Sequence, residues 1–160
     1  MHLASRLMAE PSSYSAQAAA QEPFMATIRE LVRTYQAFSG YSEGFVRRFD
    51  LTPAQFDVIA TLGNTSGMSM GEIGEKTLIT KGTLTGVIDR LERKGLIVRE
   101  VSSSDRRSTI VKLTSQGDVL FQAAFPAHIA DMKQHLAPIG VSELDDLRVL
   151  LNRLGDAFRS

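Results

Sequence analysis

The stretch Thr80–Arg107, TKGTLTGVIDRLERKGLIVREVSSSDRR, decides the fold. Its first half predicts a helix, because apolar residues recur at helical spacing along one face: Leu84, Val87, Ile88 and Leu91. Thr80 can cap the free backbone N–H groups at the start, and Gly95 can end the helix in the left-handed conformation. From residue 96 the pattern alternates, which predicts two strands, about 97–101 and 109–113, joined by a polar hairpin.

The other face of this predicted helix carries hydrogen-bond donors and positive charge. These side chains are Lys81, Thr83, Thr85, Arg90, Arg93 and Lys94. Arg106 and Arg107 lie at the tip of the predicted hairpin. The stretch is therefore a helix with a polar outer face, followed by a hairpin with a basic tip.

Helix-start signals precede this stretch. Thr52, Pro53 and Gln55 combine an N-cap, a proline at the first helical position and a capping box, which predicts a helix to about Leu62. Ser69-Met70-Gly71-Glu72 is a second capping box that opens a short helix ending near Thr77. This helix and the one from Thr80 predict a helix-turn-helix, and the hairpin adds a wing.

Long amphipathic segments flank this core. An apolar seam from Phe24 to Phe49, spaced by alternating steps of four and three, predicts a helix that Gly40 and Gly44 weaken or bend. Residues 115–136 and a last segment capped by Ser142 predict two further helices, the first bent or ended by Pro126. The seam suits a partner helix, although packing within its own domain is the alternative. Residues 1–21 predict a flexible tail.

Composition limits the possible functions. The chain has 160 residues, no Cys, no long apolar run and a formal net charge of zero. These numbers predict a cytoplasmic protein with no membrane segment, disulfide or thiolate metal site. Charge is uneven: Lys76–Arg107 holds eight Lys or Arg and four Asp or Glu, so 8 − 4 gives +4 there. A local positive surface of this kind favours a nucleic-acid partner.

The spaced residues also resemble a known family. LTPAQFDVIATL, SMGEIGEKTLITKGTLTGVIDRLERKGLIVRE and SSDRRSTIVKLTSQG are similar to the MarR family of winged helix-turn-helix transcriptional regulators over about residues 51–117. The resemblance implies a mainly α fold with a small β-hairpin. It divides the chain into a DNA-binding lobe, 51–114, and a helical dimerisation region, 22–50 and 115–160. It further implies a homodimer on double-stranded DNA, commonly a repressor relieved by a small hydrophobic or aromatic ligand.

Carried over by position, the resemblance assigns roles to single residues. The implied DNA-binding residues are Ser69, Thr80, Lys81, Thr83, Thr85, Arg90, Arg106 and Arg107. Asp105 is the acid that orients Arg107, while Asp89 is a competing partner for the same arginine. An aromatic stretch can line a ligand site: Tyr35, Phe38 and Tyr41. Residues 125–128 and 136–138 resemble the urate-responsive branch, but this chain has no Trp, so urate is not predicted.

Plainer interpretations remain open for several of these residues. Arg93 and Lys94 fit a solvated helix face, Thr80 a cap, and Asp105 a turn. The aromatic stretch can simply be core, and the winged helix can be a protein-interaction or structural module without sequence-specific DNA binding. His128 and His135 lie two helical turns apart, which favours a buried or interfacial histidine over a shared metal. With no phosphate loop or catalytic motif, we predict neither a cofactor nor an enzyme.

Overall fold

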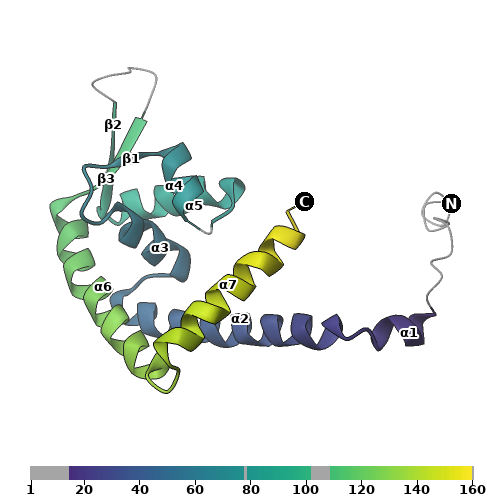
Figure 1. The fold of residues 1–160 in the computed structure, drawn as a ribbon. Coiled ribbons are helices and arrows are strands. Elements are labelled where there is room, and N and C mark those ends of the chain that lie inside the picture. Colours follow the sequence, from purple (N-terminus) through teal and green to yellow (C-terminus); the bar gives the residue numbers. More distant parts are fainter. Residues whose placement is uncertain (1–14, 78, 102–108, 160) are drawn as a thin grey trace, which may run out of the picture. The chain divides into compact units, whose positions relative to one another are not determined.

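The computed structural model describes residues 15–77, 79–101 and 109–159. The chain forms two compact units, one up to Glu43 and one from Gly44 onward (Figure 1). Helices dominate, and a small three-stranded antiparallel sheet belongs to the second unit. The predicted fold class, mainly α with a small β component, is confirmed.

The first unit holds α1 (Ala16–Ala20) and most of α2 (Phe24–Val46). The hydroxyl of Ser15 accepts a hydrogen bond from the backbone N–H of Ala18 at 3.1 Å and so caps α1, for which the sequence analysis assigned no element. Helix α2 runs through both glycines. It is followed by a 3₁₀ turn, η2 (Arg47–Phe49), and Asp50 closes that turn in the left-handed conformation, with φ of 55°.

The next three helices form the helix-turn-helix core: α3 (Pro53–Leu62), α4 (Met70–Lys76) and α5 (Lys81–Arg93). Both predicted capping boxes are confirmed, since Thr52 with Gln55 and Ser69 with Glu72 exchange backbone and side-chain hydrogen bonds. Gly95 has φ of 70° and ends α5 as predicted. The prediction for Thr80 is only half right. It occupies the N-cap position, but its side chain makes no capping bond.

The predicted hairpin is formed by β2 (Ile97–Val101) and β3 (Thr109–Leu113), with Arg99 opposite Val111. A third strand, β1 (Met68–Ser69), pairs with the other edge of β3 and was not predicted. The strand order is therefore β1-β3-β2. Because β1 leads directly into α4, the sheet ties the base of the hairpin to the start of the helix-turn-helix (Figure 1).

Two further helices complete the second unit. Thr114 caps α6 (Ser115–Leu136) through the backbone N–H of Gly117 at 3.0 Å, and the helix is continuous through Pro126 instead of ending there. Helix α7 (Val141–Ala157) begins two residues earlier than the Ser142 cap predicts, because its N-cap is Gly140. Glu143 folds back to accept from the backbone N–H of Gly140 at 2.7 Å, and this bond fixes the start at Gly140.

The core of the second unit draws side chains from most of these elements. Val46, Ile59, Ile73, Ile88 and Val111 are almost completely buried and come from α2, α3, α4, α5 and β3. Helix α7, in contrast, contains no buried residue. Among the described residues, no helix has the length and apolar character needed to span a membrane.

Candidate nucleic-acid interface

Helix α5 is held in one orientation by its apolar face. The four residues that the sequence placed on that face, Leu84, Val87, Ile88 and Leu91, are all buried, and α5 packs against α3 and β2. Rotating the helix would expose these side chains at a cost of roughly 1.5–3 kcal/mol each. The opposite face is therefore fixed outward.

The predicted DNA contacts on α5 lie on that outward face. Thr80, Thr83, Thr85 and Arg90 are exposed. The hydroxyls of Thr80 and Thr83 lie 3.0 Å apart and hydrogen bond to each other. The guanidinium of Arg90 folds back along the helix and lies over Gly86. A β-carbon added at Gly86 would be 3.5 Å from one of the guanidinium nitrogens. Three hydroxyl groups and one cation thus lie on the exposed face of α5.

The remaining predicted contacts divide into two groups. Ser69 is half-buried, and its hydroxyl donates to Glu72 at 2.8 Å while accepting from the Glu72 backbone N–H at 3.3 Å. That capping role uses the hydroxyl within the protein. The side chain of Lys81 and the whole of Asp105, Arg106 and Arg107 lie outside the described residues. Their proposed roles stay predictions.

An arginine that the sequence analysis did not select joins the hairpin to α5. Arg99 on β2 spans two carboxylates of the helix, with Nη2 2.5 Å from Asp89 Oδ1 and Nη1 2.5 Å from Glu92 Oε2. The hydrogen bond that Arg99 donates to Asp89 and the two negative charges raise the pKa of Arg99. We call these three residues the Arg99 clasp. It fixes the angle between the strand that leads into the hairpin tip and the helix with the predicted DNA contacts.

The Arg99 clasp involves one of the two acids, Asp105 and Asp89, that were predicted to pair with Arg107. Asp89 was one of them, and in the structure its carboxylate holds Arg99. The signal for Arg99 was present in the sequence. Arg99 lies on the same side of a strand as Ile97 and Val101. Asp89 and Glu92 are three residues apart on a helix, so they share a face of that helix.

A second ion pair lies at the end of α5. Lys94 was interpreted as part of a solvated face, but its Nζ lies 2.9 Å from Asp50 Oδ2 and also donates to the Asp50 backbone carbonyl. Lys94 therefore joins the C-terminal end of α5 to the turn between η2 and α3. Arg93 remains exposed, and its Nε donates to the Asp89 backbone carbonyl at 3.3 Å.

The predicted ligand-site aromatics lie in the first unit. Tyr35 and Phe38 are exposed, by 67% and 50%, and the rings of Phe38 and Tyr41 are 6.5 Å apart. Two described cavities of the second unit are lined by other residues. A ligand role for the three aromatics stays a prediction.

The two helical histidines have different environments. His128 is 4% exposed, with its ring 4.6 Å from that of Phe45 and 5.0 Å from that of Phe56. The pKa of His128 lies below its usual value, chiefly because burial disfavours the charged form. The negative charge of Asp131 opposes this shift, and the positive charge of Arg48 adds to it. His135 is exposed, with Nε2 3.5 Å from Asp131 Oδ2. Among residues 15–77, 79–101 and 109–159, no group of three or more metal-binding side chains converges.

The helix-turn-helix continues into an antiparallel hairpin, and the outer face of its second helix carries hydroxyl groups and a cation. This combination defines the winged-helix DNA-binding class. Within that class, the chain belongs to the MarR family of transcriptional regulators, whose sequence profile matches residues 49–108. The transcriptional regulator MhqR of Bacillus subtilis is 30% identical over 125 residues, which cover 78% of this chain and 86% of MhqR. The predicted family and the prediction that the chain is not an enzyme are confirmed.

Solved structures share the fold. The MepR–DNA complex of S. aureus has a TM-score of 0.72 and 22% identity, and covers 81% of this chain and 96% of that one. BpsR of Bordetella bronchiseptica, solved to explain how 6-hydroxynicotinic acid regulates its DNA binding, has a TM-score of 0.70 and 25% identity. That comparison covers 81% of this chain and 98% of BpsR.

Proposed function

We propose that this chain is a homodimeric repressor that binds a pseudo-palindromic DNA operator and is released by a small hydrophobic or aromatic ligand. The observation that carries the proposal is the outward face of α5, where Thr83, Thr85 and Arg90 are exposed while the opposite face is buried. Threonine hydroxyls near a helix start suit base edges and phosphates in a major groove, and arginine suits phosphates. Among the family's structures, MepR was solved on DNA.

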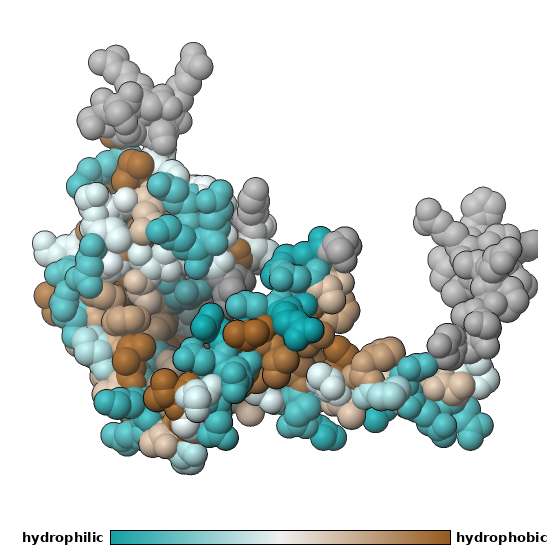
Figure 2. All heavy atoms as spheres, in the orientation of Figure 1, coloured by the Kyte–Doolittle hydropathy of each residue, from teal (hydrophilic) through white to brown (hydrophobic). Residues whose placement is uncertain are grey.

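The uncovered apolar residues of the long helices support the homodimer. Exposed large apolar side chains gather on α7, namely Val141, Leu147, Val149, Leu150 and Leu151, and others lie on α2. Hydrophobic side chains reach the surface in Figure 2 as brown patches among teal ones. Apolar surface of this extent on terminal helices favours burial against a second copy. In this proposal residues 22–50 and 115–160 form the dimerisation region, 51–114 the DNA-binding lobe and 1–21 a tail.

The hairpin tip completes the proposed DNA interface. Arg106 and Arg107 would contact phosphate or the minor groove, where the negative potential favours inserted arginine. Asp105 would orient Arg107, since Arg99 engages Asp89. Lys81, Thr80 and Ser69 would add contacts at the helix starts. Relief by a small ligand is proposed by analogy with BpsR, whose DNA binding is regulated by 6-hydroxynicotinic acid.

Selection of bound fragments from genomic DNA tests the proposal. We expect one enriched pseudo-palindrome with half-sites about one helical turn apart. With that fragment, Arg90→Gln should weaken binding and flatten the salt dependence by about one unit of slope, since one phosphate contact is lost. Arg159→Gln is the matched control, because Arg159 is exposed and pairs with Asp156 at the end of the chain. No enriched sequence would favour the protein-interaction module instead.

A further inference from the structure

Two methionines lie where the sheet meets the helix-turn-helix. Met68 is in β1 and pairs with Val111 of β3, while Met70 is the first residue of α4. Ser69 lies between them and caps α4. We call Met68, Ser69 and Met70 the β1–α4 joint. Because the chain passes directly from β1 into α4 (Figure 1), a change in this joint is transmitted to the helix-turn-helix.

Both methionine side chains combine partial exposure with contact to the core. Met68 and Met70 are half-buried, and both pack against the buried apolar cluster of the second unit. That cluster includes Ile73 and Val111, which are completely buried. A dissolved oxidant can therefore reach the joint in the folded protein, and a chemical change there alters the packing of the core.

The chain on either side of the joint leaves little room for movement. Gly67 has φ of 110°, and a β-carbon there would lie 2.9 Å from the carbonyl oxygen of Val111, so this turn is pressed against β3. On the other side, a β-carbon at Gly74 of α4 would lie 3.6 Å from a methyl group of Leu84, so α4 touches α5. A bulkier or more polar side chain in the joint therefore disturbs its neighbours on both sides.

The sulfur of this protein is all thioether, since the chain has six Met and no Cys. With hypochlorous acid, a thioether sulfur bonds to the chlorine and hydroxide leaves; water then adds its oxygen to the sulfur as chloride leaves. The net products are methionine sulfoxide, chloride and a proton, so the sulfur is oxidised and the chlorine is reduced. The sulfoxide is polar, and methionine sulfoxide reductases convert it back to the thioether.

We propose that Met68 and Met70 form a reversible oxidation site at which hypochlorous acid loosens the β1–α4 joint. Oxidation places a polar S–O group against an apolar cluster, which is unfavourable, so the start of α4 and the pairing of β1 with β3 are weakened. Neither the oxidation nor the loosening depends on DNA. Only the expected loss of operator affinity rests on the proposed function, because α4 helps to position α5.

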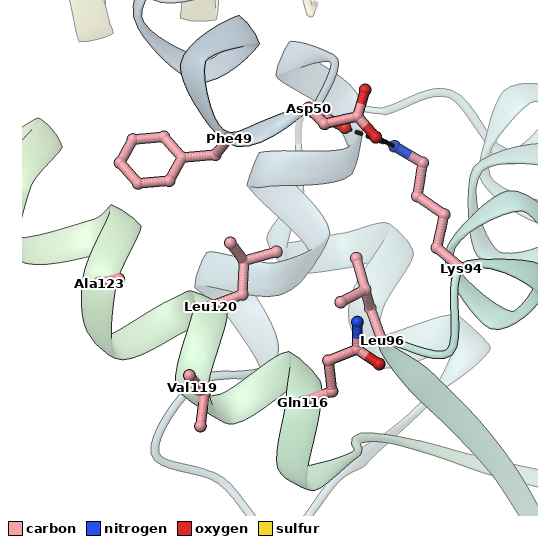
Figure 3. A pocket seen from close by; sticks show the side chains of 8 residues that line it. All are labelled: Phe49, Asp50, Lys94, Leu96, Gln116, Val119, Leu120 and Ala123. Atoms are coloured by element: carbon pink, nitrogen blue, oxygen red, sulfur yellow. Dashed lines mark hydrogen bonds and ion pairs between the residues drawn. The ribbon is translucent and has the colours of Figure 1, made fainter.

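Two other methionines provide an internal control. Met25 of α2 and Met132 of α6 are also half-buried, but neither is among the described residues that pack against the buried cluster. The residues that line the cavity in Figure 3 include no methionine, so oxidation does not change its wall directly. The proposal therefore depends on where the oxidised sulfur lies and not only on its exposure.

Thermal unfolding of the full chain without DNA tests the site directly. The protein is treated with a small excess of hypochlorous acid, and mass spectrometry of its peptides measures the oxygen gained by each methionine. We expect oxidation of Met68 and Met70 to lower Tm by at least about 2 °C. Met68→Leu/Met70→Leu keeps the side-chain volume and should resist this loss. Met25→Leu/Met132→Leu should lose as much as the wild type.

Reversal by methionine sulfoxide reductases separates thioether oxidation from other damage. We expect the reductases to restore the Tm of the oxidised wild type. An equal loss of Tm in Met68→Leu/Met70→Leu and wild type, protection by Met25→Leu/Met132→Leu, no recovery with the reductases, or no oxygen gained at Met68 and Met70 would overturn the proposal. If Met68→Leu/Met70→Leu does not fold, the single variants replace it, and each should retain part of the loss.

Operator binding is measured separately, by titrating the selected DNA fragment with oxidised and with reduced protein. We expect oxidation to weaken binding of the wild type at least about tenfold, and to leave Met68→Leu/Met70→Leu unchanged. If the protein binds no specific DNA, the proposed function fails while Tm and mass spectrometry still decide the oxidation site. If oxidation lowers Tm but leaves operator affinity unchanged, the regulatory step is refuted.

Discussion

Replacing Arg99 by alanine should loosen the hairpin from α5 and weaken operator binding. Arg99 contacts one oxygen each of Asp89 and Glu92, so its removal leaves two carboxylates three residues apart on one helix face. The local charge of the clasp changes from 1 − 2 = −1 to −2. Both carboxylates then repel each other and lie on the helix proposed to approach phosphate.

The size of the effect follows from the exposure of the three side chains. The side chain of Arg99 is 28% exposed, that of Asp89 49% and that of Glu92 38%, so water screens much of each attraction. Partly exposed ion pairs contribute up to about 1 kcal/mol each, and the forked geometry favours the upper part of that range. The loss of both pairs should cost about 1–2 kcal/mol of unfolding free energy. For a protein of this length that lowers Tm by about 2–8 °C.

Thermal unfolding and DNA titration of a variant series separate the clasp from a general loss of charge. Arg99→Lys keeps the charge but cannot span both carboxylates, so it should fall between wild type and Arg99→Ala. Adding Asp89→Asn and Glu92→Gln to Arg99→Ala removes the unpaired charges and should recover part of both losses. If Arg99→Ala matched wild type in Tm and operator affinity, or if the triple variant recovered neither, the clasp would have no role in holding the hairpin.

Two further predictions concern the core of the second unit. Stability should fall as the pH drops below 6.5, the ordinary pKa of histidine, since burial lowers the pKa of folded His128 and the unfolded chain therefore takes up the proton first. His128→Phe should remove this part of the pH dependence in denaturant titrations, and an unchanged profile would contradict it. Gly117→Ala should destabilise by about 1–3 kcal/mol or more, because its β-carbon would lie 1.9 Å from the Leu96 carbonyl oxygen. Gly82→Ala, with no atom within 4 Å of its β-carbon, should be neutral or stabilising in the same Tm measurement.

Local chemistry explains which elements could be predicted. Capping boxes act within four residues, so Thr52 and Ser69 marked helix starts correctly. The same range allows local competition, and this is why two predictions differed from the structure. The Thr80 hydroxyl pairs with Thr83 instead of capping the backbone, and Glu143 caps the N–H of Gly140, so α7 starts before Ser142.

Contacts between residues that are distant in the sequence could not be predicted in the same way, because no local sequence pattern marks them. Strand β1 has two residues, too few for a period, and its partners on β3 are more than 40 residues away. Lys94 meets Asp50 across 44 positions, so its charge alone suggested a solvated face. The Arg99 clasp spans ten positions at most and was within reach, because an arginine on the inner side of a short strand needs an acidic partner.

The two ion-pair sites together suggest how binding strength and sequence preference are separated in this protein. The Arg99 clasp and the Lys94–Asp50 pair hold α5 through its C-terminal half, while Thr83 and Thr85 lie exposed in its N-terminal half. Neither site uses these threonines. Loosening either site therefore changes how firmly α5 is oriented and leaves the groups proposed to contact bases unchanged. Operator affinity should then fall for Arg99→Ala, while the order of preference among operator sequences stays the same.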